Sequence, residues 1–154
     1  MKGLIQRVTH ASITVDQKTV SEIDAGLLLL LGIEKSDDPA IAETLCRKVI
    51  HYRIFADDQG RMNRSLLDTG GYLLVVPQFT LAADTRSGTR PGFSVAAPPK
   101  QAEALFREFL AVSEQYIGEG LVGRGQFGAD MKVALVNDGP VTFLLEAGGG
   151  PGAK

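Results

Sequence analysis

Two short segments carry the residue types in this chain that could do chemistry. The first, residues 77–81 (PQFTL), directly follows an apolar run. A strand end followed by an irregular loop is where α/β sheets place ligands. Gln78 and Thr80 would supply polar groups there, and Phe79 an apolar wall. Taken alone, the segment is more typical of a plain strand end and its loop than of a site.

The second segment is residues 137–142 (NDGPVT). Taken alone, it is most typical of a turn between two strands. A cis bond before proline costs only about 0.5–1 kcal/mol, and a cis Gly139–Pro140 bond could turn two successive carbonyl oxygens to the same side. Such a pair could accept hydrogen bonds from an ammonium group. Because Gly139 has no side chain, a ligand could approach this backbone closely.

Other site chemistries lack their residues or their spacing. The chain has two histidines, His10 and His51, and one cysteine, Cys46, so neither a metal-ligand cluster nor a histidine-based triad is expected. Residues 123–128 match the letters GxGxxG, but a strand pattern follows them instead of the helix that a nucleotide site requires. The aspartates fall mostly near turns and in no pairing pattern. We therefore expect neither a metal nor a cofactor.

Composition bounds the class of protein. The 154 residues, 44% hydrophobic and 22% charged, suit one soluble domain with a core of its own. The longest apolar run, residues 26–33, is too short to span a membrane, and one cysteine fits a reducing compartment. We expect a cytoplasmic protein without a targeting segment or a membrane partner. The net charge of −2 argues against a protein that coats nucleic acid but leaves room for one that grips an RNA end.

The elements that must position the two segments begin with β structure. Alternating side chains indicate strands near residues 4–16 and 19–23, and residues 27–33 are apolar on both faces, as in a buried central strand. A helix follows, with Asp38 as its N-cap and Pro39 at its first position. Cys46 belongs to the apolar stripe of this helix, and we interpret it as a core residue, not a catalytic thiol.

The second half positions both segments. Residues 72–76 form a buried strand that leads into PQFTL, and residues 82–98 have no clean period; a loop this long in a small domain is usually functional. A helix over residues 99–117 and three strands, at 121–127, 131–136 and 141–145, complete an α/β domain with a mixed sheet of about seven strands and two helices. We place the domain at residues 1–147 and expect residues 148–154, rich in glycine, to be a disordered tail.

Together, these segments resemble the D-aminoacyl-tRNA deacylase family, also called D-tyrosyl-tRNA deacylase. The family's SQFTL signature is similar to residues 77–81, and its NDGPVT signature is intact at 137–142. Its GxFGAxM stretch is similar to residues 125–131, its NRPxF loop to residues 89–93, and the resemblance runs from the start of the chain to about residue 146.

Two positions depart from the family pattern. Pro77 stands where the family usually has Ser, and Thr89 where it has Asn. Proline has neither a hydroxyl nor a backbone N–H, so any role of those groups is absent here, and Pro77 is left out of the site.

The resemblance implies a homodimer with a barrel-like sheet, two helices and no cofactor. It implies hydrolysis of the ester that joins a D-amino acid to the acceptor end of tRNA, a proofreading step in translation. Gln78, Phe79 and Thr80 would be the catalytic residues, with backbone N–H groups near Phe79 and Thr80 holding the oxyanion. The terminal ribose 2′-hydroxyl of the tRNA would assist, which would explain the lack of a protein triad.

The resemblance also implies how one hand of amino acid is chosen. A cis Gly139–Pro140 bond would reach into the partner subunit's site, capture the α-ammonium and leave no space for an L side chain. A D side chain would point outward, and glycine would also fit. Arg7 would brace this gate, and Met131, in the GxFGAxM stretch, is a further candidate for substrate binding.

The RNA itself needs basic side chains. Arg86, Arg90 and Lys100 flank the irregular loop and are the candidate contacts, with Arg64 and Arg124 as further ones. Two alternatives stay open. The chain could be a non-catalytic module that binds RNA ends or sites of DNA unwinding, with Pro77 marking lost activity, or an ordinary esterase that acts on small amino-acid esters without tRNA.

Overall fold

A long antiparallel strand begins the chain in the computed structural model, which describes residues 1–149. β1 (Lys2–Val15) turns at Asp16 and Gln17, both with left-handed backbone (φ 49° and 65°), into β2 (Lys18–Ile23). β3 (Gly26–Gly32) then pairs antiparallel with the first half of β1. The expected strands are therefore present, and the turn between them lies one residue earlier than residues 17–18, where the gap between the expected strands placed it.

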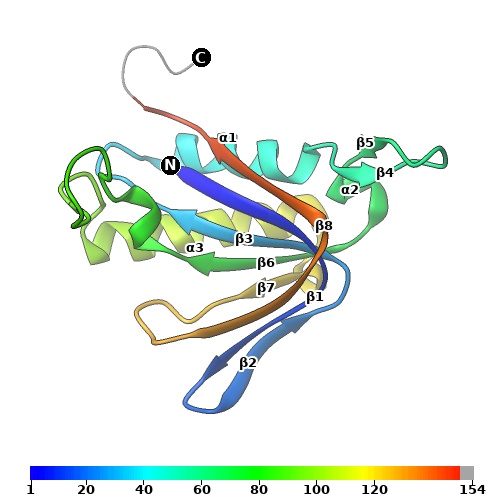
Figure 1. Cartoon of the computed structure of the whole chain (residues 1–154), viewed down its shortest axis with the longest axis horizontal. Coiled ribbons are helices and arrows are strands. Elements are labelled where there is room, and N and C mark those ends of the chain that lie inside the picture. Colours follow the sequence, from blue (N-terminus) through cyan, green and yellow to red (C-terminus); the bar gives the residue numbers. More distant parts are fainter. Residues whose placement is uncertain (150–154) are drawn as a thin grey trace.

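The centre of the sheet is parallel. β3 pairs with β6 (Tyr72–Pro77), which pairs with the short β7 (Val122–Arg124), both in parallel. The strand order is β2-β1-β3-β6-β7, and β8 (Lys132–Glu146) pairs with β1. The sheet is mixed, as predicted, and it is strongly twisted and curled toward a barrel (Figure 1). Because both parallel strands are buried, they read as continuous apolar runs.

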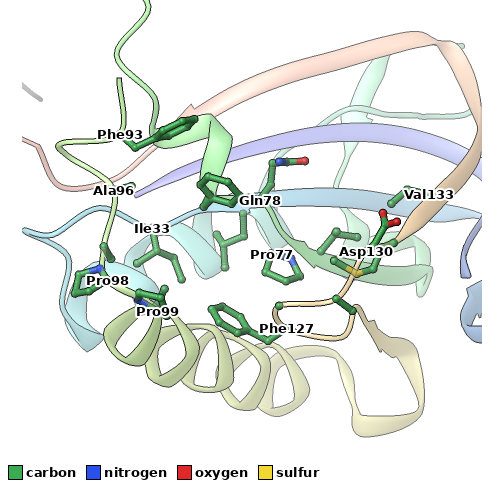
Figure 2. Close-up of a pocket in the computed structure, with 18 residues that line it drawn as sticks. Ile33, Pro77, Gln78, Phe93, Ala96, Pro98, Pro99, Phe127, Asp130 and Val133 are labelled. Atoms are coloured by element: carbon green, nitrogen blue, oxygen red, sulfur yellow. The ribbon is translucent and has the colours of Figure 1, made fainter. Parts of the chain in front are cut away.

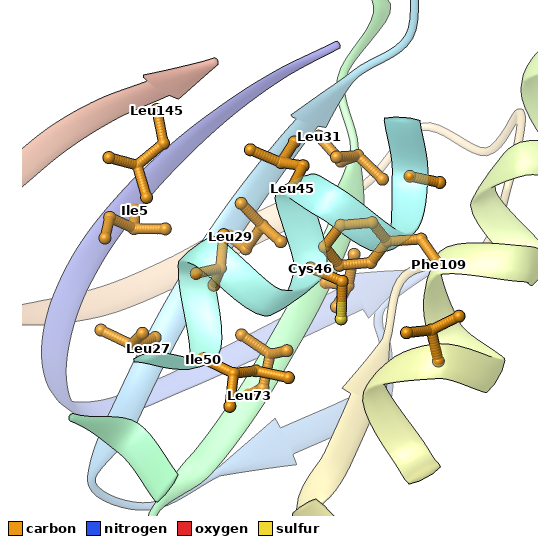
Figure 3. Packing of buried hydrophobic residues seen from close by; sticks show 14 of the residues in the cluster. Ile5, Leu27, Leu29, Leu31, Leu45, Cys46, Ile50, Leu73, Phe109 and Leu145 are labelled. Carbon is orange, nitrogen blue, oxygen red and sulfur yellow. The ribbon is translucent and has the colours of Figure 1, made fainter. Parts of the chain in front are cut away.

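Two long helices cover one face of this sheet. α1 (Pro39–His51) begins at Asp38, whose side chain accepts from the Ile41 N–H at 2.8 Å, and Pro39 is its first residue, as predicted. α3 (Pro99–Ile117) ends before Gly118 (φ 98°). Both helices bury side chains against alternate residues of β3 in the main core (Figure 3). A second cluster lies on the other face of the sheet and contains Leu28, Leu74 and Val76.

The structure confirms the interpretation of Cys46 as a core residue. It is fully buried between the two helices (Figure 3), and its Sγ lies 3.2 Å from the Ser113 hydroxyl oxygen. Burial among apolar side chains raises the pKa of this thiol to about 11. A thiol with a raised pKa is mostly protonated at neutral pH, so it is a poor nucleophile.

Five short elements were not predicted. β4 (Phe55–Ala56) and β5 (Met62–Arg64) form a small hairpin, which α2 (Leu66–Thr69) follows. The structure thus has a third, one-turn helix beside the two expected ones, and two 3₁₀ turns, η1 (Phe79–Ala82) and η2 (Glu119–Leu121).

The strand expected over residues 121–127 was too long. β7 ends at Arg124. The chain then turns: the Ala129 N–H donates to the Gln126 carbonyl at 3.2 Å, and Gly128, inside this turn, has a φ of 77°.

The turn expected between two final strands was wrong. β8 is one continuous strand, and it pairs with β1 on both sides of the suspected turn: Val8 lies opposite Asn137, and Gln6 opposite Thr142. Residues 138–141 therefore bulge out of the ladder opposite Arg7. The Asn137 side chain holds the bulge, because its Oδ1 accepts from the Val141 N–H at 2.7 Å.

The two ends of the described chain lie together. The Met1 ammonium donates to Asp37 Oδ1 at 2.7 Å and to the Ala147 carbonyl at 2.9 Å, and both Met1 and the Asp37 side chain are buried. Most of the tail expected to be disordered, residues 150–154, lies outside the described residues. None of the helices in residues 1–149 has the length and apolar character that crossing a membrane takes.

Candidate functional site

The PQFTL segment leaves the sheet at the end of β6. The Gln78 N–H donates to the Leu31 carbonyl at 2.8 Å, which extends the pairing with β3 by one residue. η1 then packs against the end of β3, where a Cβ on Gly32 would lie 2.7 Å from Leu81 Cβ. Glycine at position 32 therefore lets the turn approach the sheet, and the approach leaves Phe79 and Thr80 exposed.

A cavity of about 690 Å³ opens beside this turn. Its walls come from the ends of β3 and β6, from η1, from the segment before α3 and that helix's first turn, and from residues 127–133 (Figure 2). They are mostly apolar and include Ile33, Val76, Phe93, Pro99, Phe127 and Met131. This size and character are typical of pockets that bind small organic groups.

The polar groups beside this cavity lie around Gln78. Its Nε2 donates to the Thr80 hydroxyl oxygen, so the hydroxyl hydrogen of Thr80 stays free to donate elsewhere. Within residues 1–149, the backbone N–H groups of Phe79 and Thr80 have no hydrogen-bond acceptor. Two adjacent N–H groups and a hydroxyl can together stabilise a negatively charged oxygen.

An aromatic pair stands at the rim. The Phe79 and Phe93 rings lie with centroids 5.2 Å apart and planes inclined by 52°. They keep 61% and 41% of their surface exposed, respectively. Phe93 and Phe127 lie on opposite sides of the pocket (Figure 2).

The expected gate lies elsewhere in the same chain. The Gly139–Pro140 bond is cis, and both residues are exposed at the β8 bulge. Arg7 contacts this bulge as expected: its Nε donates to the Asp138 carbonyl at 2.8 Å, and its Nη1 to the Ile54 carbonyl at 2.6 Å. None of these residues lines the pocket. The pocket and the bulge of one chain are therefore separate surfaces.

Met131 belongs to the pocket and not to the bulge. It lines the cavity, and a Cβ on Gly125 would lie 2.9 Å from its sulfur, so this glycine makes room for Met131. The structure thus brings together Gln78, Phe79 and Met131 on one surface, with Thr80 beside them.

The basic candidates differ in how free they are. The Arg86 guanidinium donates two hydrogen bonds to Asp84, at 2.8 and 2.7 Å, and holds the pKa of that carboxyl well below its usual range. Arg124 is paired with Glu114, and Arg64 donates to the Asp68 carbonyl.

Two of the basic candidates are left unpaired. Arg90 and Lys100 are exposed, and neither takes part in an ion pair within the part of the chain that the structure describes.

Sequence reasoning missed most of the pocket wall. Ile33, Pro99 and Phe127 were assigned to ordinary elements, although Phe93 and Phe127 fall in stretches that carry the family resemblance. The signals that point to this region are the strand end at PQFTL, the long irregular loop and the stretches that carry the family resemblance. Among the described residues, no group of three His, Cys, Asp or Glu side chains could hold a metal ion.

Known proteins resemble this chain over nearly its whole length. A family model described as D-Tyr-tRNA(Tyr) deacylase matches residues 4–146. A Marinobacter nauticus protein named D-aminoacyl-tRNA deacylase is 62% identical over 148 residues, which cover 96% of this chain and 95% of that protein. One of the same name from Stutzerimonas stutzeri is 59% identical over 147 residues, 96% of this chain and all of that protein.

Two solved structures share the fold. One, described as c-Myc DNA Unwinding Element Binding Protein, has a TM-score of 0.93 and 39% identity and covers 97% of this chain and 100% of its own. The other, described as a probable eukaryotic D-amino acid tRNA deacylase, has a TM-score of 0.78 over 94% of this chain and 98% of its own; at 16% identity it shows the fold alone.

Proposed function

The chain belongs to the D-Tyr-tRNA(Tyr) deacylase family, and from that premise we propose that it hydrolyses the ester of D-aminoacyl-tRNA beside Gln78, Phe79 and Thr80. It is an enzyme of the hydrolase class. The observation that carries the location is that the Phe79 and Thr80 N–H groups, next to the pocket, have no hydrogen-bond acceptor within residues 1–149.

The reaction needs stabilisation of charge more than a protein nucleophile. Water attacks the ester carbonyl carbon, and the carbonyl oxygen becomes an oxyanion that the Phe79 and Thr80 N–H groups can hold. The bond from that carbon to the ribose oxygen then breaks, and the ribose oxygen takes a proton. The products are a free D-amino acid and tRNA. The ribose 2′-hydroxyl beside the ester assists; among the residues that the structure describes, no group of three His, Cys, Asp or Glu side chains lies together to take its place.

The pocket receives the terminal nucleoside of the RNA. Its volume of about 690 Å³ and its apolar and aromatic walls suit a base and ribose, and the ester then lies at η1. The exposed Arg90 and Lys100 are the best candidates for the phosphates, because Asp84 already holds Arg86. Two phosphate contacts are enough for an RNA end and agree with a net charge of −2.

The chiral gate works across a homodimer. The Gly139–Pro140 bulge does not line the pocket of its own chain, and we propose that it completes the pocket of a second copy. Its exposed backbone would then occupy the place of an L side chain, and its carbonyls would accept from the α-ammonium. Glycine has no side chain to reject, so glycyl-tRNA is a further substrate. Translation is cytoplasmic, and we propose the same location for this enzyme.

The decisive test is hydrolysis of matched D- and L-tyrosyl-tRNA by the purified protein. We expect release of D-tyrosine and no measurable release of L-tyrosine. A protein that binds the RNA and cleaves neither would instead be a non-catalytic nucleic-acid module. Cleavage of free tyrosine esters without tRNA would indicate an ordinary esterase.

A further inference from the structure

We infer that Phe79 and Phe93 form a stacking platform for the nucleotide that precedes the terminal one in the RNA, which rests on the proposed function. The terminal nucleoside fills the pocket, so the next nucleotide must leave over the rim. The rim there is an aromatic pair that stays exposed. Every base has a π-face, and a base stacked on an aromatic ring is bound without regard to its identity.

The platform is fixed in place from both sides. Phe79 belongs to η1, which is anchored to β3 through Gln78. Phe93 follows a closed loop: the Asp84 and Gly92 backbones exchange hydrogen bonds of 2.7 and 3.0 Å, and the Ala96 N–H donates to the Phe93 carbonyl at 3.2 Å. Rings held in advance lose little conformational entropy when a base stacks on them.

The charges nearby favour RNA as the occupant over a protein segment. Arg90 lies in the loop that carries Phe93, three residues before it, and is exposed and outside the ion pairs found within residues 1–149. It is therefore available for the phosphate that links the last two nucleotides. The carboxylate of the pocket, Asp130, lies away from Phe93 (Figure 2) and is paired with Lys132 at 3.3 Å.

The test measures kcat/KM of the enzyme for two small ester substrates. One is D-alanyl adenosine, and the other is the cytidylyl-adenosine dinucleotide with the same D-alanyl ester. The methyl side chain of D-alanine is too small to stack, so any difference comes from the added nucleotide. We expect the wild type to have a kcat/KM about tenfold higher for the dinucleotide ester, the effect of one stacked base. Phe93→Leu should bring this ratio close to one, and Phe93→Tyr should keep it.

A matched control is Val20→Ala, since Val20 is 44% exposed on β2 and is not a pocket residue. It should keep the wild-type ratio. Equal kcat/KM for both esters in the wild type would overturn this inference and leave the proposed function intact, whereas a wild type that hydrolyses neither these esters nor D-tyrosyl-tRNA would overturn both. Sedimentation is the second measurement: dissociation of a wild-type dimer by Phe93→Leu would mean that the ring packs against protein, and would overturn the platform.

Discussion

Thr80 carries the smallest chemical group on which the proposed reaction depends. Its hydroxyl accepts from Gln78 and has a free hydrogen to donate, and a donor central to an oxyanion is worth roughly 2.7–4 kcal/mol. Thr80→Ala should therefore lower kcat by up to about a hundred- to a thousandfold. Thr80→Ser should keep most of the rate. Single-turnover cleavage of D-tyrosyl-tRNA measures both, and a wild-type rate in Thr80→Ala would leave this residue a structural role only.

Cys46 should make the stability of the protein fall at high pH. Its thiol has an ordinary pKa of 9.0 in the unfolded chain and about 11 in the fold. A raised folded pKa means that the contribution to the free energy of unfolding is complete below pH 9 and is lost as the pH rises toward 11. Urea unfolding of wild type and Cys46→Ala at several pH values measures this. The difference between the two proteins should shrink across that window, and a constant difference would contradict the assignment.

At the scale of elements, long periodic segments could be predicted and local detours could not. The strand-like run before PQFTL and the Asp38-Pro39 helix start are local signals, and both elements formed where predicted. The NDGP letters favour a turn, but the strand on either side pairs with the same partner, β1. Only the tertiary pairing shows that these residues form a bulge.

The bulge gives a prediction about chirality. Arg7 is its brace, with hydrogen bonds of 2.8 Å to the Asp138 carbonyl and 2.6 Å to the Ile54 carbonyl. Hydrogen bonds from charged groups are worth about 1.5–3 kcal/mol, so Arg7→Ala should loosen the bulge and raise cleavage of L-tyrosyl-tRNA relative to D-tyrosyl-tRNA by at least about tenfold.

Gly139→Ala provides an independent perturbation of the same bulge. Its Cβ would lie 2.5 Å from the Val141 nitrogen, so the bulge must shift. The rates of D- and L-tyrosyl-tRNA cleavage by both variants test whether the bulge is the gate. If each variant keeps the wild-type D-to-L ratio, the bulge is not the gate.

At the scale of the whole molecule, the pocket could not be predicted because segments distant in the sequence build it. Ile33, Phe93 and Phe127 come from three separate segments of the chain and line the same pocket. The strand end indicated Gln78, Phe79 and Thr80, and the family resemblance implied their roles. Periodicity and the Asp38–Pro39 helix start predicted the elements. The separation of pocket and bulge within one chain was visible only in three dimensions.

If one subunit supplies the gate and the other the pocket, a mixture of two defective variants should regain activity. Gly139→Ala removes the gate and Thr80→Ala the catalytic hydroxyl, so each homodimer has two defective sites. A heterodimer of the two variants has one site with both an intact gate and an intact Thr80. Co-refolding the variants should therefore restore one intact site in each heterodimer, about half the activity of a wild-type dimer, measured as D-tyrosine release. Activity of the mixture no higher than the sum of its parts would place gate and pocket in the same chain.

The contacts of Met1 with Asp37 and Ala147 also affect the force at which the fold ruptures under mechanical tension. Lys2 lies opposite Glu146 in the β1–β8 ladder, and antiparallel hydrogen bonds run perpendicular to the strands. Tension applied at Met1 and Ala147 would load the buried ion pair first and then the β1–β8 backbone hydrogen bonds one after another. Handles at Met1 and Lys132, at opposite ends of the ladder, would load all rungs in shear. Optical-tweezer traces should show the lower rupture force for the first pair of handles.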